Sequence, residues 1–258
     1  MKKRGLNSFG QVSVFVILAI VIIVAGGIAY YISKTSSGFD KRFSSDAAVQ
    51  EKFDLLKDSI LDCVDLTETE SLNTIGIQGG YYDKPEKYFD LEWAFIPYYY
   101  YEGISMAPGK IKVQGELAKF VNDNLPVCFE GIDKGDFSID YKTPKTSVKI
   151  NTNDVKFDIE LPISINREGK TVMLDLKDAP MYFDLGLANI LDLGKYIADE
   201  AVNDDKMVCL SCITKAAGDR NLIVDMVNLE SAGTLVVITT NSTTTGEYAF
   251  EFLNKYKE

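Results

Sequence analysis

An uncharged apolar segment, Gln11–Ile32 (QVSVFVILAIVIIVAGGIAYYI), constrains the fold of this chain more than any other feature. An α-helix rises about 1.5 Å per residue, so roughly 20 apolar residues cross the ~30 Å hydrocarbon core of a bilayer. Backbone polar groups in lipid must pair within the segment, which favours a helix despite the many β-branched residues. The segment therefore predicts a transmembrane helix over residues 11–33, in contact with the lipid bilayer through Val12–Ile32.

The length and flanks of this segment favour a retained anchor over a cleaved signal peptide. The apolar core of a signal peptide is only about 7–15 residues long, and Tyr30 and Tyr31 lie where an interfacial aromatic belt is expected. Cleavage at Ala25-Gly26-Gly27 stays open as an alternative. Three basic residues precede the segment and mixed charges follow it, so the positive-inside rule predicts a cytoplasmic leader at residues 1–10 and an extracellular C-terminal part of the chain.

The chain beyond the segment is strongly acidic. All 38 Asp and Glu residues lie there, whereas three of the 27 Lys and Arg residues precede the segment. An acidic surface argues against nucleic acid as a partner and against adsorption to an anionic bilayer, because both depend on basic side chains. The expected partners are therefore the lipid bilayer and a protein at the cell surface.

The sequence contains no histidine. Histidine is the commonest general base and metal ligand, and it is a member of the Ser-His-Asp and Cys-His pairs. We find no catalytic constellation, no cofactor-binding motif and no metal-ligand spacing, so the sequence predicts a protein that is not an enzyme.

The rest of the chain predicts an α+β fold, with helices packed on antiparallel sheet after a linker at residues 34–45. A long helix is expected from a cap at Ser45 or Asp46 to about Ile75, with Cys63 on its apolar face. A shorter helix near residues 113–125 is expected to end at Pro126, just before Cys128. The long helix also carries several acids, expected mostly on its solvated faces: Asp62, Asp65, Glu68 and Glu70.

Apolar residues alternate with polar ones after residue 135, which predicts an antiparallel meander. Its expected strands cover residues 136–141, 147–151, 155–165 and 171–176. Helical spacing returns at residues 185–202, and three more strands follow at 222–227, 234–240 and 247–253. We therefore predict two α+β regions, 46–184 and 185–258.

Aromatic residues are concentrated in the segment Glu92–Tyr101, which is expected to be a strand. One hypothesis is a binding surface made by Trp93 and Tyr98, Tyr99, Tyr100 and Tyr101, since tyrosine gives a large contact area at low entropic cost. The alternative is a strand packed on both faces, with its hydroxyl groups reaching water. Alternation along the strand puts successive tyrosines on opposite faces, which favours the second interpretation.

Four cysteines in an extracytoplasmic chain favour disulfides, for which three pairings exist. We expect Cys63–Cys128 and Cys209–Cys212, although pairings that cross these two remain open. Two other hypotheses are a redox-active C-x-x-C at residues 209–212 and a zinc site built from all four thiolates. In addition, Asn241-Ser242-Thr243 forms a candidate glycosylation site at Asn241.

Two stretches resemble known proteins. Gly10-Gln11-Val12-Ser13-Val14-Phe15, ahead of a hydrophobic helix, resembles the start of archaeal type IV pilin-like proteins, although it lacks the glutamate that precedes the phenylalanine there. The order Cys63…IGIQGGYYDKPEKY…IPYYYYEG…NLPVC resembles an uncharacterised group of single-pass membrane proteins of small-genome archaea. That second resemblance implies a surface location and no activity.

Three functional hypotheses follow. The leading one is a membrane-anchored extracytoplasmic protein without catalysis, used for envelope structure, adhesion or partner binding. The second is a pilin-like filament subunit, and the third is a C-x-x-C thiol–disulfide oxidoreductase. A mature chain that begins at Gln11 would favour the filament subunit over the plain anchor.

Overall fold

In the computed structural model the described residues are 43–178, 180–203, 208–240 and 248–257. The anchor Val12–Ile32, the leader and most of the linker lie outside them. Within the described ranges, no helix is both long enough and apolar enough to cross a membrane. Residues 43–258 form one compact unit, and its described part has the mixture of helices and antiparallel-rich sheets of an α+β fold.

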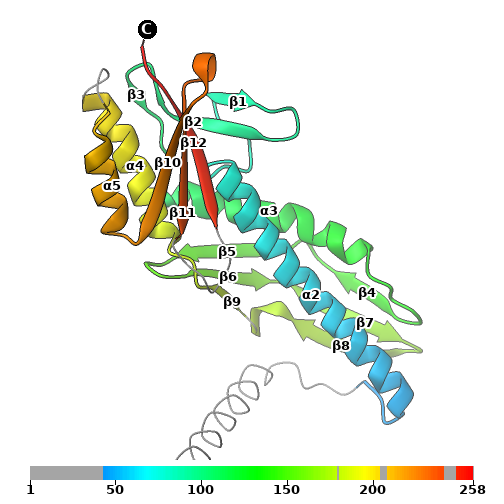
Figure 1. The fold of residues 1–258 in the computed structure, drawn as a ribbon. Coiled ribbons are helices and arrows are strands. Elements are labelled where there is room, and N and C mark those ends of the chain that lie inside the picture. Colours follow the sequence, from blue (N-terminus) through cyan, green and yellow to red (C-terminus); the bar gives the residue numbers. More distant parts are fainter. Residues whose placement is uncertain (1–42, 179, 204–207, 241–247, 258) are drawn as a thin grey trace, which may run out of the picture. The chain divides into compact units, whose positions relative to one another are not determined.

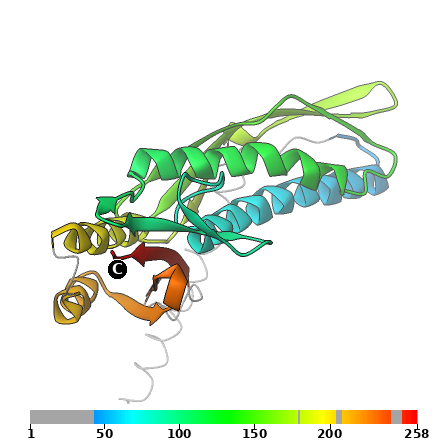
Figure 2. The same ribbon diagram turned by 90° about the horizontal axis from the view of Figure 1, so that it is seen from above.

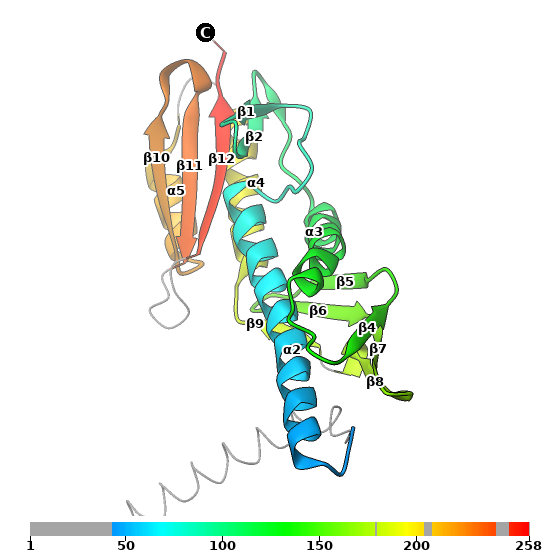
Figure 3. The ribbon, with the colours of Figure 1, turned by 90° about the vertical axis from the view of Figure 1, so that its right-hand side faces the viewer.

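The longest element is helix α2 (Ala47–Ile77), which packs along α3 (Lys110–Glu130) (Figures 1 and 3). The Asp46 side chain caps α2 by accepting a hydrogen bond from the N–H of Ala48 at 3.0 Å. An apolar face of α2 is buried along its whole length, by the residues Phe53, Leu56, Ile60, Val64, Leu72 and Ile75. The expected helix is therefore present, with ends within two residues of those predicted.

Helix α3 continues through Pro126, so the predicted end of this helix is wrong. Proline lacks an N–H and costs a helix about 3 kcal/mol in its interior. Tertiary contacts hold the turn that follows: Phe129 is fully buried and Cys128 is bonded to α2. The local signal of Pro126 is thus overridden by packing that the sequence does not reveal.

The largest sheet has the strand order β1-β2-β12-β11-β10, and β3 pairs with β2. Its strands are β1 (Tyr88–Asp90), β2 (Phe95–Tyr101), β3 (Ile104–Ser105), β10 (Leu222–Asn228), β11 (Thr234–Thr240) and β12 (Ala249–Lys255). Neighbours are antiparallel except β2 and β12, which are parallel. The sheet combines strands from both predicted regions, 46–184 and 185–258.

Helices α4 (Leu187–Asn203) and α5 (Leu210–Gly218) pack on this sheet, α4 against β2 and β12 and α5 against β10 (Figures 2 and 3). The contact of α4 is close at Gly194, where an added Cβ would lie 3.1 Å from the Tyr99 ring and 3.3 Å from Phe252. Strand β10 forms the outer edge of the sheet.

The predicted meander is divided between two three-stranded sheets, β4-β7-β8 and β5-β6-β9. Their strands are β4 (Ser138–Tyr141), β5 (Lys145–Ile150), β6 (Val155–Glu160), β7 (Pro162–Arg167), β8 (Lys170–Asp175) and β9 (Met181–Phe183). The single strand expected over residues 155–165 is wrong, because the chain breaks at Leu161 and passes from one sheet to the other. Pro162 begins the new strand, a position where the missing N–H is tolerated.

Candidate functional site

The structure contains a disulfide between Cys63 of α2 and Cys128 of α3. The Cα atoms are 5.8 Å apart; Cys63 is only 7% exposed, and Cys128 is half-buried. This is the pairing that we expected, and it explains why the apolar face of α2 includes a cysteine. The bond joins α2 to α3 covalently.

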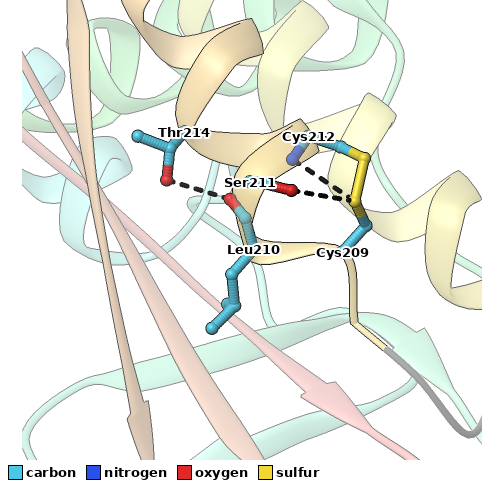
Figure 4. The surroundings of a disulfide bond; sticks show 5 residues. All are labelled: Cys209, Leu210, Ser211, Cys212 and Thr214. Atoms are coloured by element: carbon cyan, nitrogen blue, oxygen red, sulfur yellow. Dashed lines mark hydrogen bonds between the residues drawn. A yellow bond between two sulfur atoms is a disulfide. The ribbon is translucent and has the colours of Figure 1, made fainter.

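A second disulfide joins Cys209 and Cys212 at the beginning of α5 (Figure 4). Cys209 is the N-cap of the helix: its Sγ accepts a hydrogen bond from the backbone N–H of Cys212 at 3.3 Å. The Ser211 hydroxyl lies 3.6 Å from the same sulfur. Cys209 is half-buried, whereas Leu210, Ser211 and Cys212 are exposed. This bond therefore lies at the surface, in contrast to the bond between α2 and α3.

Helix α5 is held in place independently of its disulfide. Ile213 and Ala217 are buried, four residues apart on one face, and the helix packs on β10. Near the end of the helix, Lys215 donates a hydrogen bond to Asp219 at 2.8 Å. The apolar face fixes the helix, so the C-x-x-C is presented from a rigid element.

Because all four cysteines are in these two disulfides, neither a crossed pairing nor a zinc site of four thiolates occurs in the structure. Among the described residues, no group of three or more Cys, Asp or Glu side chains is placed to hold a metal ion. The candidate glycosylation site Asn241 lies outside the described residues.

The tyrosines of β2 do not form a binding surface. Tyr98, Tyr99 and Tyr100 are all buried, so the surface hypothesis is wrong for them, and the strand is packed on both faces. The hydroxyl groups do not reach water as we expected: Tyr98 donates to the carbonyl of Ala232 at 2.9 Å and Tyr99 to that of Gly79 at 3.0 Å. Burial raises the pKa of Tyr99 well above its usual range, so this hydroxyl keeps its proton and remains a donor.

Trp93 is separated from the buried tyrosines and is 79% exposed. It lies in the tight turn between β1 and β2, where Glu92 has a φ of +71°. The N–H of Leu91 donates to the carbonyl of Ala94 at 2.9 Å and closes the turn. The structure therefore separates Trp93 from the tyrosines, of which Tyr98 and the half-buried Tyr101 pack edge to face at 5.1 Å.

Glu68 is a buried acid that the sequence analysis placed with the solvated acids of α2. Asp62, Asp65 and Glu70 are exposed as expected, but Glu68 is 1% exposed, and neither carboxyl oxygen has a hydrogen-bond partner among the described residues. Burial raises the pKa of Glu68 to about 8, with a smaller contribution from the charge of Asp65. Its spacing of four residues from the buried Val64 is the signal that would have shown this position.

Glu116 is a second buried acid, and it has a structural role. Its carboxylate accepts hydrogen bonds from the backbone N–H groups of Tyr82 and Asp83, at 2.8 and 2.9 Å, and pairs with Lys112. These bonds tie the turn that follows α2 to the first turns of α3. Its spacing, three residues after Val113 and four before Phe120, is the sequence signal that would have shown this position.

A groove of about 370 Å³ lies between the start of α2 and the turn that precedes β4. Its charges are compensated within the protein, because Asp136 lies 3.4 Å from Lys52 and 3.7 Å from Arg167. Arg167 also lies over the ring of Phe137, at 5.5 Å. The groove is lined by two basic and two acidic side chains, Lys52, Lys134, Asp133 and Asp136, so it has no net charge to select a ligand. The C-x-x-C at α5 is the better candidate site.

Comparison with known proteins identifies no relative: no protein-family model, no curated protein and no solved structure matches this chain.

Proposed function

We propose that this protein is anchored in the cell membrane by Val12–Ile32 and has an extracytoplasmic role in envelope structure, adhesion or partner binding. The N-terminus is cytoplasmic in this arrangement, and the residues from about 33 onward lie outside. The charge pattern around the segment supports this orientation.

The Cys63–Cys128 bond is the observation that supports an extracytoplasmic location most directly. Disulfides form and persist in oxidising compartments, whereas cytosolic thiol pools keep cysteines reduced. The bond connects residues 65 positions apart in sequence, so it restricts the unfolded chain strongly and contributes to the stability of the α2–α3 pair.

The surface charge fits the same location. The chain has a net charge of −11 and a sequence pI of about 4.6, which suits a solvated face outside the cell and disfavours nucleic acid. Trp93 supports the partner-binding alternative, because an exposed tryptophan offers a large apolar contact area to another protein.

A topology experiment tests this proposal on the full chain, expressed with different epitope tags at its two ends. In intact cells, added protease is expected to remove the C-terminal tag and to leave the N-terminal tag until the cells are permeabilised. Alkylation before lysis, followed by peptide mass mapping, is expected to find Cys63 and Cys128 unmodified. A protected C-terminal tag together with alkylated Cys63 and Cys128 would show that the location is wrong.

The same material gives the mature N-terminus by mass spectrometry. A chain that retains the apolar segment after its basic leader is expected. A chain that begins at Gln11 would instead support the pilin-like alternative.

A further inference from the structure

The two disulfides of this protein differ in their exposure to solvent, a property that distinguishes redox-active disulfides from structural ones. Cys63 is buried and Cys128 is half-buried, whereas Cys209 is half-buried and Cys212 is exposed. Thiol–disulfide exchange needs access of an attacking thiolate to one of the two sulfurs. The bond at the beginning of α5 is the one that includes an exposed cysteine, so an attacking thiolate reaches it more easily.

The surface bond also adds less to the stability of the fold than Cys63–Cys128 does. It connects residues only three positions apart, and a disulfide that closes a shorter loop gives a smaller entropic stabilisation. Ile213 and Ala217 are buried and anchor α5, so the helix is expected to stay in place when the bond opens. Opening of the surface bond is therefore expected to leave α5 packed on β10.

The surroundings of Cys209 favour it as a leaving thiolate. Its sulfur accepts the Cys212 N–H at 3.3 Å, lies 3.6 Å from the Ser211 hydroxyl and caps the N-terminus of α5. Negative charge is stabilised at a helix N-terminus, and C-x-x-C thiolates at such positions are stabilised for this reason. The Cys212 N–H and the Ser211 hydroxyl, which would stabilise a Cys209 thiolate, already lie next to this sulfur in the oxidised protein.

We infer that Cys209 and Cys212 form a redox-active pair that oxidises two cysteine thiols of a polypeptide substrate to a disulfide. A substrate thiolate attacks the exposed Cys212 Sγ, the Cys209–Cys212 bond breaks, and Cys209 leaves as a thiolate. The second substrate thiolate then attacks the substrate sulfur of the mixed disulfide, and Cys212 leaves. The substrate loses two electrons and two protons, and the pair takes up two electrons and ends as two thiols.

Leu210 points to a polypeptide as the substrate. It lies between the two cysteines in the sequence and is 61% exposed, and its side chain points away from the disulfide (Figure 4). Only a substrate longer than glutathione can contact the Leu210 side chain while one of its thiols reaches the sulfurs. A polypeptide can contact it with its own side chains during exchange, whereas glutathione offers little apolar surface.

The test uses the oxidised full-length protein in detergent, mixed at pH 7 with a reduced peptide that carries two cysteines. Aliquots are alkylated and mapped by mass spectrometry. We expect one peptide disulfide per Cys209–Cys212 bond lost, with Cys63–Cys128 intact and reacting at least about tenfold more slowly. A surface bond that survives, or that opens no faster than Cys63–Cys128, would overturn the inference.

Single variants test the assigned roles. Cys209→Ser keeps an oxygen that caps α5 and leaves Cys212 free, so it is expected to accumulate a mixed disulfide with the oxidised peptide. Cys212→Ser leaves only the half-buried Cys209 and is expected to trap much less. Equal trapping by both variants would contradict the assignment of Cys212 as the attacked sulfur. Circular dichroism and the intact Cys63–Cys128 bond verify folding.

Leu210→Ala tests the substrate class. We expect it to slow exchange with the peptide several-fold and to leave exchange with reduced glutathione unchanged. An equal effect on both reductants, or no effect on either, would show that a polypeptide is not selected here. The assay uses purified protein, so a failure of the proposed topology would not alter it, and its own failure would leave the topology experiment unaffected.

Discussion

Tyr99 and Gly79 are joined by a hydrogen bond of 3.0 Å, from the tyrosine hydroxyl in β2 to the glycine carbonyl in the turn after α2. Both residues are buried, and Gly79 has a φ of +51°. An aromatic strand that looks like a binding surface in the sequence is thus an internal support, which fixes the end of the longest helix against the sheet.

Removing this hydroxyl is expected to destabilise the protein. Tyr99→Phe leaves the Gly79 carbonyl buried without its partner, which costs about 1–3 kcal/mol in the free energy of unfolding. Tyr101→Phe, at a half-buried position on the same strand, is the matched control and should cost under about 0.5 kcal/mol. Urea unfolding of both variants measures the difference, and equal losses would show that the bond to Gly79 contributes nothing specific.

Glu68 is expected to make stability fall as the pH rises. Its pKa is about 8 in the folded protein against an ordinary value of 4.5, so the native state holds a proton that the unfolded state has lost between these values. The free energy of unfolding should therefore fall between about pH 4.5 and pH 8, by up to about 5 kcal/mol, and change little outside this window. Urea unfolding at pH 5 and pH 8.5 measures it.

Glu68→Gln should abolish most of this fall, because an amide does not ionise. Glu70→Gln, an exposed change in the same helix, is the control and should keep the pH dependence of the wild type. An unchanged fall in Glu68→Gln would assign the effect to another group.

The two disulfides are expected to contribute unequally to stability. In the loop-entropy model, a bond across 65 residues is worth about 4 kcal/mol and one across three residues about 2 kcal/mol. Thermal unfolding should therefore show a larger drop in Tm for Cys63→Ser with Cys128→Ser than for Cys209→Ser with Cys212→Ser. A reversed order would indicate that the surface bond has a structural role.

Gly76 is expected to be intolerant of a side chain. An added Cβ would lie 2.5 Å from the Ala249 carbonyl oxygen and 2.9 Å from the Tyr248 hydroxyl, so Gly76→Ala must push α2 away from β12 and should cost about 1–3 kcal/mol. Gly115→Ala is the control in α3, where nothing lies within 4 Å, and it should stabilise the helix by about 0.5–1 kcal/mol. Chemical unfolding compares the two, and equal signs would contradict the close contact.

The sequence predicts the elements that depend on local pattern. The long helix that begins after Asp46 follows from capping and hydrophobic spacing, and both expected cysteine pairs are present. The C-x-x-C was identified from the sequence, but its position as the cap of a short helix and its exposure come from the structure.

Other features depend on contacts between distant residues. The parallel pairing of β2 with β12 joins residues near 98 and 253, and no local periodicity specifies such a partner. The continuation of α3 through Pro126 and the burial of Glu68 likewise result from neighbours brought by the fold. The sequence-based prediction is wrong for the end of α3 and for the exposure of Glu68, and it makes no statement about the pairing of β2 with β12.

The position of β12 between β2 and β11 has a consequence for synthesis. The centre of the largest sheet is supplied by Ala249–Lys255, after every other strand has been made. While the ribosome is still producing that segment, β2 lacks its parallel neighbour, and Tyr99 lacks the Phe252 ring on which it stacks. The sheet is therefore expected to close only after residue 255 has emerged, so that a nascent chain stalled before β12 remains exposed to proteases and chaperones.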